Sequence, residues 1–291
     1  MHRQSSTRKS RAEPLYLKSK MDVEDFENVT LNDTESGPEF HYQRPSNFIL
    51  VPTAIVTLLS IVADVLIIYV IAKFKNLRTT INLYILNWRI CNVLFLTLSP
   101  ANFTVLALLE FVYVDVACVW YGEILVTFTG NFTFAIALTL DWCILNYASP
   151  AFALKIQSYY KVNVTLLWLL TASLSIFVCF DCTLVIFTHW ISLLQPGYFI
   201  IILIVHFVRF VKLKTSNSRE KSNLVLILVS LYFLFWVPSY VMHCIKLFGS
   251  DQSIYPEIVV FCHLIAYSYS LMLILLLYLY DRNFQSSFKA L

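Results

Sequence analysis

The chain has 291 residues, of which 58% are hydrophobic and only 13% are charged. Water-soluble domains carry about 25% charged residues, so this composition excludes an ordinary soluble protein and favours one that spans a membrane. The net charge of +3 does not point to a nucleic-acid partner, because the bases are confined to certain connections between apolar stretches. A single water-soluble helical bundle is the alternative, but its helices would need polar faces that these stretches lack.

Residues 1–46 differ from the rest of the chain. Most of the bases in this segment come first, and a run of acids follows between Asp22 and Glu39. Few apolar residues are available to build a core, so we expect a disordered tail. Asn28 and Asn32 each begin an Asn-x-Thr glycosylation sequence, which would suit a tail outside the cell.

Seven apolar stretches follow within residues 47–280, and each is long enough to cross a bilayer as a helix, which takes about 20 residues. We therefore expect an all-α fold, a bundle of seven membrane-spanning helices. The stretches are Asn47–Ala72, Ile81–Pro100, Cys118–Tyr147, Val164–Thr188, His189–Val211, Asn223–Leu247 and Ile254–Tyr280.

The charges on the connections between these stretches predict the orientation. Lys and Arg gather on the first, third and fifth connections and on the C-terminal segment, and the largest group lies between Arg209 and Lys221. The second, fourth and sixth connections carry acids and a single base, Lys246. Short loops rich in Lys and Arg remain in the cytoplasm. The N-terminus should therefore lie outside the plasma membrane and the C-terminus inside, with the basic face toward anionic lipid.

Residues 281–291 form the last predicted element. Phe284, Phe288 and Leu291 follow one another at i, i+4 and i+7, which puts them on one side of a helix. Arg282 and Lys289 would then lie near lipid headgroups. We expect a short amphipathic helix on the cytoplasmic surface of the membrane, with its apolar side against lipid.

Several short motifs occur in a recognisable order along residues 48–291. They are Leu77–Asn87 (LRTTINLYILN), Cys118, Trp168, Phe235-Trp-Val-Pro238, Tyr267-Ser268 and Asn283–Lys289 (NFQSSFK). In this order and at these spacings the chain resembles the rhodopsin-like (class A) G-protein-coupled receptors, nearest to the branch of the somatostatin, opioid and allatostatin-C receptors. The resemblance implies a seven-helix receptor that binds an extracellular ligand and acts on a heterotrimeric G protein.

The resemblance also assigns roles to single residues. It implies a disulfide between Cys118 and a cysteine of the second outer connection, Cys182 or alternatively Cys179. Pro238 removes a backbone hydrogen bond and should kink its helix. Trp236 precedes this proline by two residues, and the resemblance makes it the floor of a ligand pocket, with plain packing between helices as the alternative.

Several switch positions depart from the family pattern. Trp142-Cys143-Ile144 stands where the family has Asp-Arg-Tyr, so Cys143 cannot make the charged contacts of that arginine. Asp64 and Asn92 exchange the family's Asn and Asp on the first two spans, and we expect the two side chains to hydrogen-bond. Other polar groups of the family's sodium site are replaced, so no sodium binding is expected.

The second and seventh stretches hold two further departures. Arg89 lies within the second stretch, where an arginine is costly unless it is paired or reaches the membrane surface. We expect it to extend to the inner headgroups, or alternatively to pair with Asp141. Leu273-Ile-Leu-Leu-Leu277 replaces the family's Asn-Pro-x-x-Tyr, so the proline kink of that helix is absent.

Helical spacing projects a set of mostly aromatic and weakly polar residues to one inner face near the outer end of the bundle. They are Leu125, Thr129, Trp236, Tyr240, His243, His263 and Tyr267. This set suits a peptide or a neutral organic ligand. Ordinary packing is the alternative, and a metal held by the two histidines is disfavoured. The sequence contains no catalytic triad or phosphate loop, so we expect neither an enzyme nor a cofactor.

Two functions therefore compete. The first is a divergent receptor for a neuropeptide or another extracellular ligand, which signals by ligand-driven rearrangement of its helices. The alternative is a receptor-derived protein that binds ligand or partner receptors without activating G proteins, and the altered switch positions make it a serious one. A transporter or channel is disfavoured because the sequence shows no internal repeat.

Overall fold

The structure, a computed structural model, describes residues 47–108, 114–180, 184–215, 224–248 and 256–291. The predicted tail with Asn28 and Asn32 lies outside these residues, and so does Cys182. The described chain is almost entirely helical and holds no strand, which confirms the all-α class.

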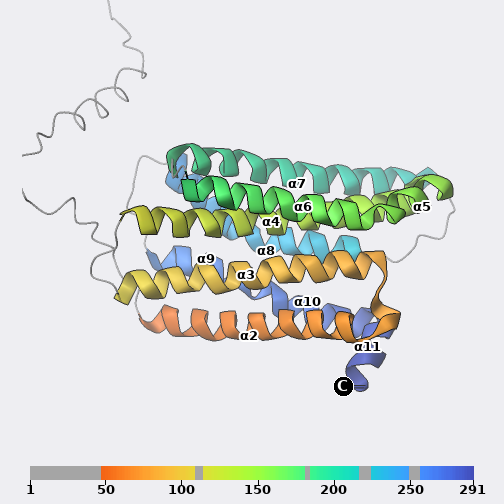
Figure 1. Cartoon of the computed structure of the whole chain (residues 1–291), viewed down its shortest axis with the longest axis horizontal. Coiled ribbons are helices and arrows are strands. Elements are labelled where there is room, and N and C mark those ends of the chain that lie inside the picture. The colour runs from red at the N-terminus through yellow and green to blue at the C-terminus, as the bar shows by residue number, and fades with distance from the viewer. Residues whose placement is uncertain (1–46, 109–113, 181–183, 216–223, 249–255) are drawn as a thin grey trace, which may run out of the picture. The chain divides into compact units, whose positions relative to one another are not determined.

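Eleven helical elements build the described part, and the longer helices lie side by side with roughly aligned axes (Figure 1). They are α2 (Asn47–Lys73), η1 (Lys75–Leu77), α3 (Thr80–Leu108), α4 (Val114–Tyr147), α5 (Pro150–Ser158), α6 (Tyr160–Phe180), α7 (Leu184–Thr215), α8 (Leu224–Phe248), α9 (Pro256–Tyr267), α10 (Tyr269–Tyr280) and, turning away from the bundle, α11 (Arg282–Lys289). Of these, η1 is a short 3-10 turn that joins α2 to α3.

Five stretches of described helix are long and apolar enough to cross a membrane. They are Phe48–Lys73, Thr80–Ser99, Val126–Tyr147, Leu224–Met242 and Glu257–Tyr280. Two shorter apolar stretches, Tyr160–Ile176 and Pro196–Val211, lie in α6 and α7. The outward faces carry large apolar side chains such as Leu58, Leu203 and Phe207, which suit contact with lipid.

Two predicted helix ends are wrong. α3 continues past Pro100 to Leu108, because the apolar sequence runs on and membrane helices tolerate proline. The fourth and fifth predicted stretches should meet at Thr188 and His189, but both residues lie inside α7. The described part of α6 ends at Phe180.

The predicted seventh stretch is divided at Ser268. The backbone amide of Leu271 bonds to the Ser268 carbonyl at 3.1 Å, three residues back, so the regular ladder slips there. The Ser268 hydroxyl donates to the Ile265 carbonyl at 2.7 Å. The carbonyl of Tyr267 accepts a hydrogen bond at 2.7 Å from the Ser60 hydroxyl of α2. The helix is therefore interrupted without a proline, and α2 supplies a donor at the interruption.

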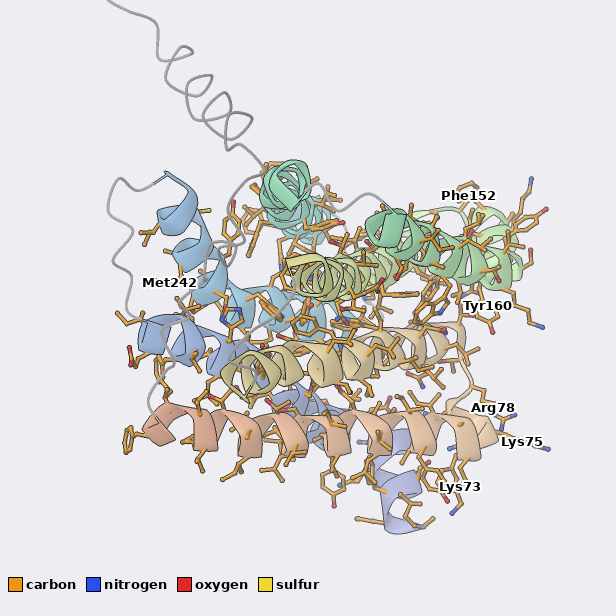
Figure 2. The ribbon with its side chains drawn as sticks, turned by 60° about the vertical axis from the view of Figure 1, so that its left-hand side comes forward. Lys73, Lys75, Arg78, Phe152, Tyr160 and Met242 are labelled. Atoms are coloured by element: carbon orange, nitrogen blue, oxygen red, sulfur yellow. The ribbon has the colours of Figure 1, made fainter. Side chains whose placement is uncertain are left out.

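Three bases of the first connection, Lys73, Lys75 and Arg78, lie at one end of the bundle, here called the basic end. Figure 2 shows Lys73, Lys75 and Arg78 at the end where Phe152 and Tyr160 also lie, with Met242 toward the other end. The Arg78 side chain donates to the carbonyl of Ala72 and so caps the end of α2. This separation of charge agrees with the alternation read from the connections.

α11 is anchored at both its start and its apolar face. The Asp281 carboxylate accepts from the amides of Asn283 at 2.9 Å and Phe284 at 3.2 Å, which is an N-cap. Phe284 is 0% exposed and belongs to the main core. The prediction that Phe284 faces lipid is therefore wrong, because this ring packs inside the protein while Leu291 remains exposed.

Candidate functional site

Asp64 lies at the centre of a buried polar cluster that joins three helices. Its carboxylate accepts from the Asn92 amide of α3 at 2.6 Å and from the Ser270 hydroxyl of α10 at 3.0 Å. The Asn92 amide also donates to Ser270 at 3.0 Å. The expected hydrogen bond between the exchanged Asp and Asn is present, and α2, α3 and α10 are tied together at this depth.

Arg89 completes this cluster, and both predictions for it are wrong. Its guanidinium lies 3.3 Å from the Asp64 carboxylate, and both side chains are 0% exposed. Arg89 therefore neither reaches the headgroups nor pairs with Asp141. The guanidinium also lies over the Trp88 ring, 4.0 Å from its centroid, and 5.5 Å from the ring centroid of Tyr269. An ion pair supported by two aromatic faces lowers the cost of a buried arginine.

A layer of aromatic rings lies around Trp236 of α8. The ring centroid of Trp236 is 4.6 Å from Phe128, 5.5 Å from Phe95, and 6.4 Å from both His263 and Tyr267. The indole nitrogen of Trp236 is buried and has no hydrogen-bond partner among the described residues. A buried donor in this position can bind an acceptor such as a carbonyl oxygen of a ligand.

The structure brings together part of the predicted pocket. Trp236, His263 and Tyr267 are mutual neighbours, and the Tyr267 hydroxyl shares a 2.7 Å hydrogen bond with Ser99. The ring of Tyr240 instead lies against Phe199 of α7, and the two ring centroids are 5.9 Å apart. Thr129 is half-buried in α4. The side chains of Leu125, His243 and Cys118 fall outside the described part, although their backbones are helical.

Sequence reasoning missed several members of this layer. Phe95, Phe128 and Phe132 are buried around Trp236. Ser99 hydrogen-bonds to the hydroxyl of Tyr267, which is a neighbour of Trp236. Phe128 and Phe132 are four residues apart on α4, so they share one face, and this spacing was an available signal. Phe95 and Ser99 repeat the same spacing on α3.

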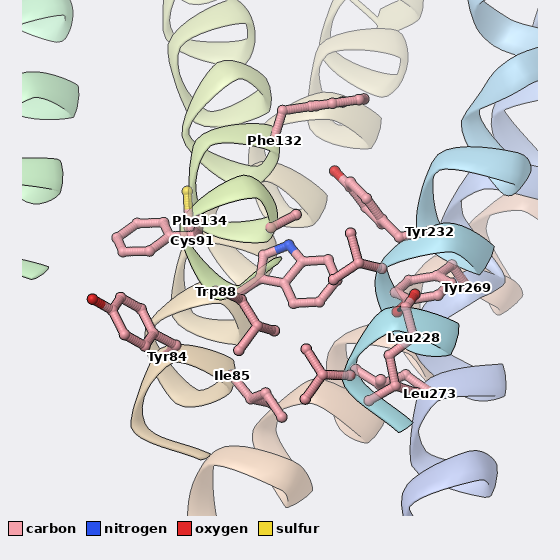
Figure 3. Packing of buried hydrophobic residues seen from close by; sticks show 14 of the residues in the cluster. Tyr84, Ile85, Trp88, Cys91, Phe132, Phe134, Leu228, Tyr232, Tyr269 and Leu273 are labelled. Atoms are coloured by element: carbon pink, nitrogen blue, oxygen red, sulfur yellow. Dashed lines mark hydrogen bonds between the residues drawn. The ribbon is translucent and has the colours of Figure 1, made fainter. Parts of the chain in front are cut away.

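A second aromatic layer connects Trp236 with the polar cluster. Figure 3 shows Trp88 at the middle of this packing, with Tyr232 and Tyr269 beside it. The Trp88 and Tyr232 centroids are 4.9 Å apart, and those of Tyr232 and Tyr269 are 5.1 Å apart. The Tyr269 hydroxyl donates to the Leu228 carbonyl of α8 at 2.7 Å. Rings from α3, α8 and α10 therefore form an unbroken path between the two halves of the bundle.

A cavity of about 200 Å³ lies at the basic end, directly beyond this second layer. Its walls come from α3, α4, α8, α10 and α11, and the lining residues are Thr79, Ile81, Asn82, Ile85, Trp142, Leu145, Asn146, Leu224, Val225, Leu228, Leu277, Asp281 and Asn283. The lining is apolar with three amides and one carboxylate, and it includes no base. Trp142 lines this cavity and is 1% exposed, while Cys143 is half-buried beside it.

Comparison with known proteins finds distant similarity to a receptor. No protein-family model matches the chain. Over 235 residues it is 27% identical to somatostatin receptor type 4 of Rattus norvegicus, a class A G-protein-coupled receptor. The chain is similar to a class A receptor. The aligned part covers 67% of this chain and 60% of that receptor, so the chain spans about three fifths of its relative.

The similarity to this receptor and the apolar helices of the structure indicate the same general class of protein. Both fit a divergent class A receptor, a multi-pass protein of the plasma membrane, and the relative itself is a receptor rather than an enzyme. Among the described residues, no group of His, Cys, Asp and Glu side chains is arranged to hold a metal ion.

Proposed function

We propose that the chain is a divergent rhodopsin-like receptor that crosses the plasma membrane seven times, with its N-terminus outside. The α9–α10 pair would form one of the seven crossings. In this orientation the basic end faces the cytoplasm, where bases on short connections remain. The bridge between Cys118 and Cys182 (or Cys179), and glycans on Asn28 and Asn32, are part of the proposal because they suit the outer side.

The ligand site would be the aromatic layer around Trp236, open toward the outer end. The observation that carries this proposal is the buried indole nitrogen of Trp236 without a partner, inside a ring of Phe95, Phe128, His263 and Tyr267. Leu125, Thr129, Tyr240 and His243 would extend the site outward. Aromatic faces with a few polar groups suit a peptide or a neutral organic ligand rather than a cationic amine.

Binding would be transmitted along the rings between the two ends. A ligand that displaces Trp236 would act on Tyr232, whose ring centroid lies 6.3 Å away, and then on Tyr269. The Tyr269 hydroxyl donates a hydrogen bond to the carbonyl of Leu228, and Leu228 lines the cavity at the basic end. A ligand that prefers one packing of these rings would therefore shift the population of cavity shapes available to a G protein.

The composition of that cavity favours a second candidate function. Its described lining holds no base, and Trp142 and Cys143 stand where the resemblance places a charged switch. A receptor-derived protein that binds ligand or a partner receptor, but does not activate G proteins, would need no base there.

An activation assay separates the two functions. Cells expressing the chain with a surface tag are exposed to a peptide library, and dissociation of each class of G protein is followed. We expect a dose-dependent response that Trp236→Leu abolishes at equal surface expression. The matched control is Phe210→Leu, since Phe210 is 67% exposed on α7 and should tolerate the change. Saturable peptide binding without activation supports the second function, and an absence of both contradicts the pocket.

Cys143→Arg tests the cavity by a gain of activity. Cys143 follows Trp142, which lines the cavity, and stands where the resemblance places the charged switch, so an arginine there would restore a base at this position. We expect higher basal G-protein activation in cells that express the variant at the wild-type level. An unchanged basal signal in a well-expressed variant would count against the first function.

A further inference from the structure

The Asp64–Arg89 pair has a feature that packing alone does not require. A buried carboxylate on α2 and a buried guanidinium on α3 face each other inside the bundle, and among the described residues the other hydrogen-bond partners of Asp64 are the neutral polar groups of Asn92 and Ser270. Among the residues whose burial is described, Arg89 is the one fully buried base, and Lys73, Lys75 and Arg78 at the basic end are exposed. Burying an unpaired charge is costly, and here each of the two charges is buried next to the other, which offsets part of that cost.

The helix geometry directs Arg89 to this place. Arg89 precedes Asn92 by three residues on α3, so both side chains project from the same face. Asn92 donates to one carboxylate oxygen of Asp64, and Arg89 donates to the other. The stacking of the guanidinium on Trp88 fixes its orientation, because the ring covers one of its faces.

The groups around Asp64 would otherwise suit a small cation. Asp64 offers two carboxylate oxygens, Ser270 offers a hydroxyl, and Asn92 carries an amide oxygen. Hard cations prefer such oxygen ligands. In this chain the positive charge at this position is the Arg89 guanidinium, 3.3 Å from the carboxylate.

We propose that the Arg89 guanidinium is a built-in counter-ion that occupies the cation position of the Asp64 pocket and closes it to diffusible monovalent cations. The charge of the pocket is then balanced within the chain, and the tie between α2, α3 and α10 does not depend on the ionic composition outside. Removal of the guanidinium leaves a buried carboxylate with oxygen ligands around it. The pocket then becomes a site for sodium.

The test uses the purified full chain in detergent and needs no ligand, so its failure would leave the proposed receptor function untouched. Thermal unfolding is measured in sodium chloride, potassium chloride and N-methyl-D-glucamine chloride at equal ionic strength. The wild type should have the same Tm in all three. Arg89→Met should lower the Tm by about 6 °C or more in N-methyl-D-glucamine and regain part of this loss in sodium.

Two variants serve as controls for this gain of sodium dependence. Asp64→Asn/Arg89→Met removes both charges and should be more stable than Arg89→Met and indifferent to sodium. Arg78→Met removes an exposed base at the basic end and should also be indifferent. If Arg89→Met fails to fold, restored folding of the double variant supports the proposal. A sodium effect in the wild type, a folded Arg89→Met without one, or a double variant no better than the single would overturn it.

Discussion

Gly130 lies where three helices leave no room for a side chain. A Cβ atom at this position of α4 would lie 2.8 Å from the Cys91 sulfur of α3 and 3.4 Å from a methyl carbon of Thr171 on α6. Cys91 is 0% exposed and its sulfur also bonds to the Thr127 carbonyl at 3.4 Å, so it cannot swing away. The close approach of α3 and α4 therefore depends on a glycine.

Gly130→Ala should overpack this contact. We expect the free energy of unfolding to fall by about 1–3 kcal/mol, measured as a lower Tm of the purified protein. Adding Cys91→Ala should recover part of the loss. Gly197→Ala is the matched control, because a Cβ there meets no atom within 4 Å. If the two alanine variants lose equal stability, the steric explanation is wrong.

Residue contacts show where sequence reasoning succeeds and where it stops. The hydrogen bond expected between Asp64 and Asn92 is present, with the Asn92 amide nitrogen 2.6 Å from the Asp64 carboxylate. The partner of Arg89 could not be predicted in this way. α2 and α3 are apolar nearly all round, so no amphipathic face fixes how each helix is rotated. Without that rotation, Asp64 was not recognisable as the acid that faces Arg89.

At the scale of elements, the interruption between α9 and α10 ties the last crossing to the first. Ser60 of α2 is 0% exposed and donates to the Tyr267 carbonyl at the interruption. This break was not predictable from the sequence, because the family's proline is absent and Ser268 is a common helix residue. At the break, the Ser268 hydroxyl bonds to the Ile265 carbonyl of its own helix, and Ser60 supplies the partner from α2.

Ser60→Ala removes the donor that α2 supplies to this carbonyl. The free energy of unfolding should fall by about 1 kcal/mol, the net value of one hydrogen bond, and Tm of the purified protein reports it. Thr97→Val provides the comparison, since Thr97 is exposed and its hydroxyl bonds only within α3 in the described contacts, to Val93. An effect of Thr97→Val as large as that of Ser60→Ala would argue against a special role for this tie.

The N-cap of α11 can be tested on its own. Asp281→Ala removes the acceptor for the amides of Asn283 and Phe284, which should destabilise α11 by about 1 kcal/mol. Hydrogen exchange at these two amides should become faster while exchange in α4 stays unchanged. Asp281→Asn keeps a capping oxygen and should behave nearly as the wild type. Unchanged exchange in the alanine variant would show that core packing of Phe284 alone holds the helix.

At the scale of the whole molecule, composition and charge predict more than any single motif. The low charged fraction and the apolar stretches indicate a membrane protein, and five described helical stretches meet the length and hydropathy that a crossing needs. The three bases of the first connection, Lys73, Lys75 and Arg78, lie at one end, as the loops predict (Figure 2). The helix ends near Pro100 and Thr188 were predicted less well, because adjoining apolar sequence carries no internal marker of where a helix stops.

We propose that the chain is a receptor whose aromatic pocket opens to the outside of the cell and whose basic end lies in the cytoplasm. Epitope tags ahead of Met1 and after Leu291, read by antibody on intact and on permeabilised cells, test it most directly. The first tag should be reached on intact cells, and the second only after permeabilisation. If the tag ahead of Met1 is hidden until cells are opened, or both tags lie on the same side, the orientation and the receptor function proposed here are contradicted together.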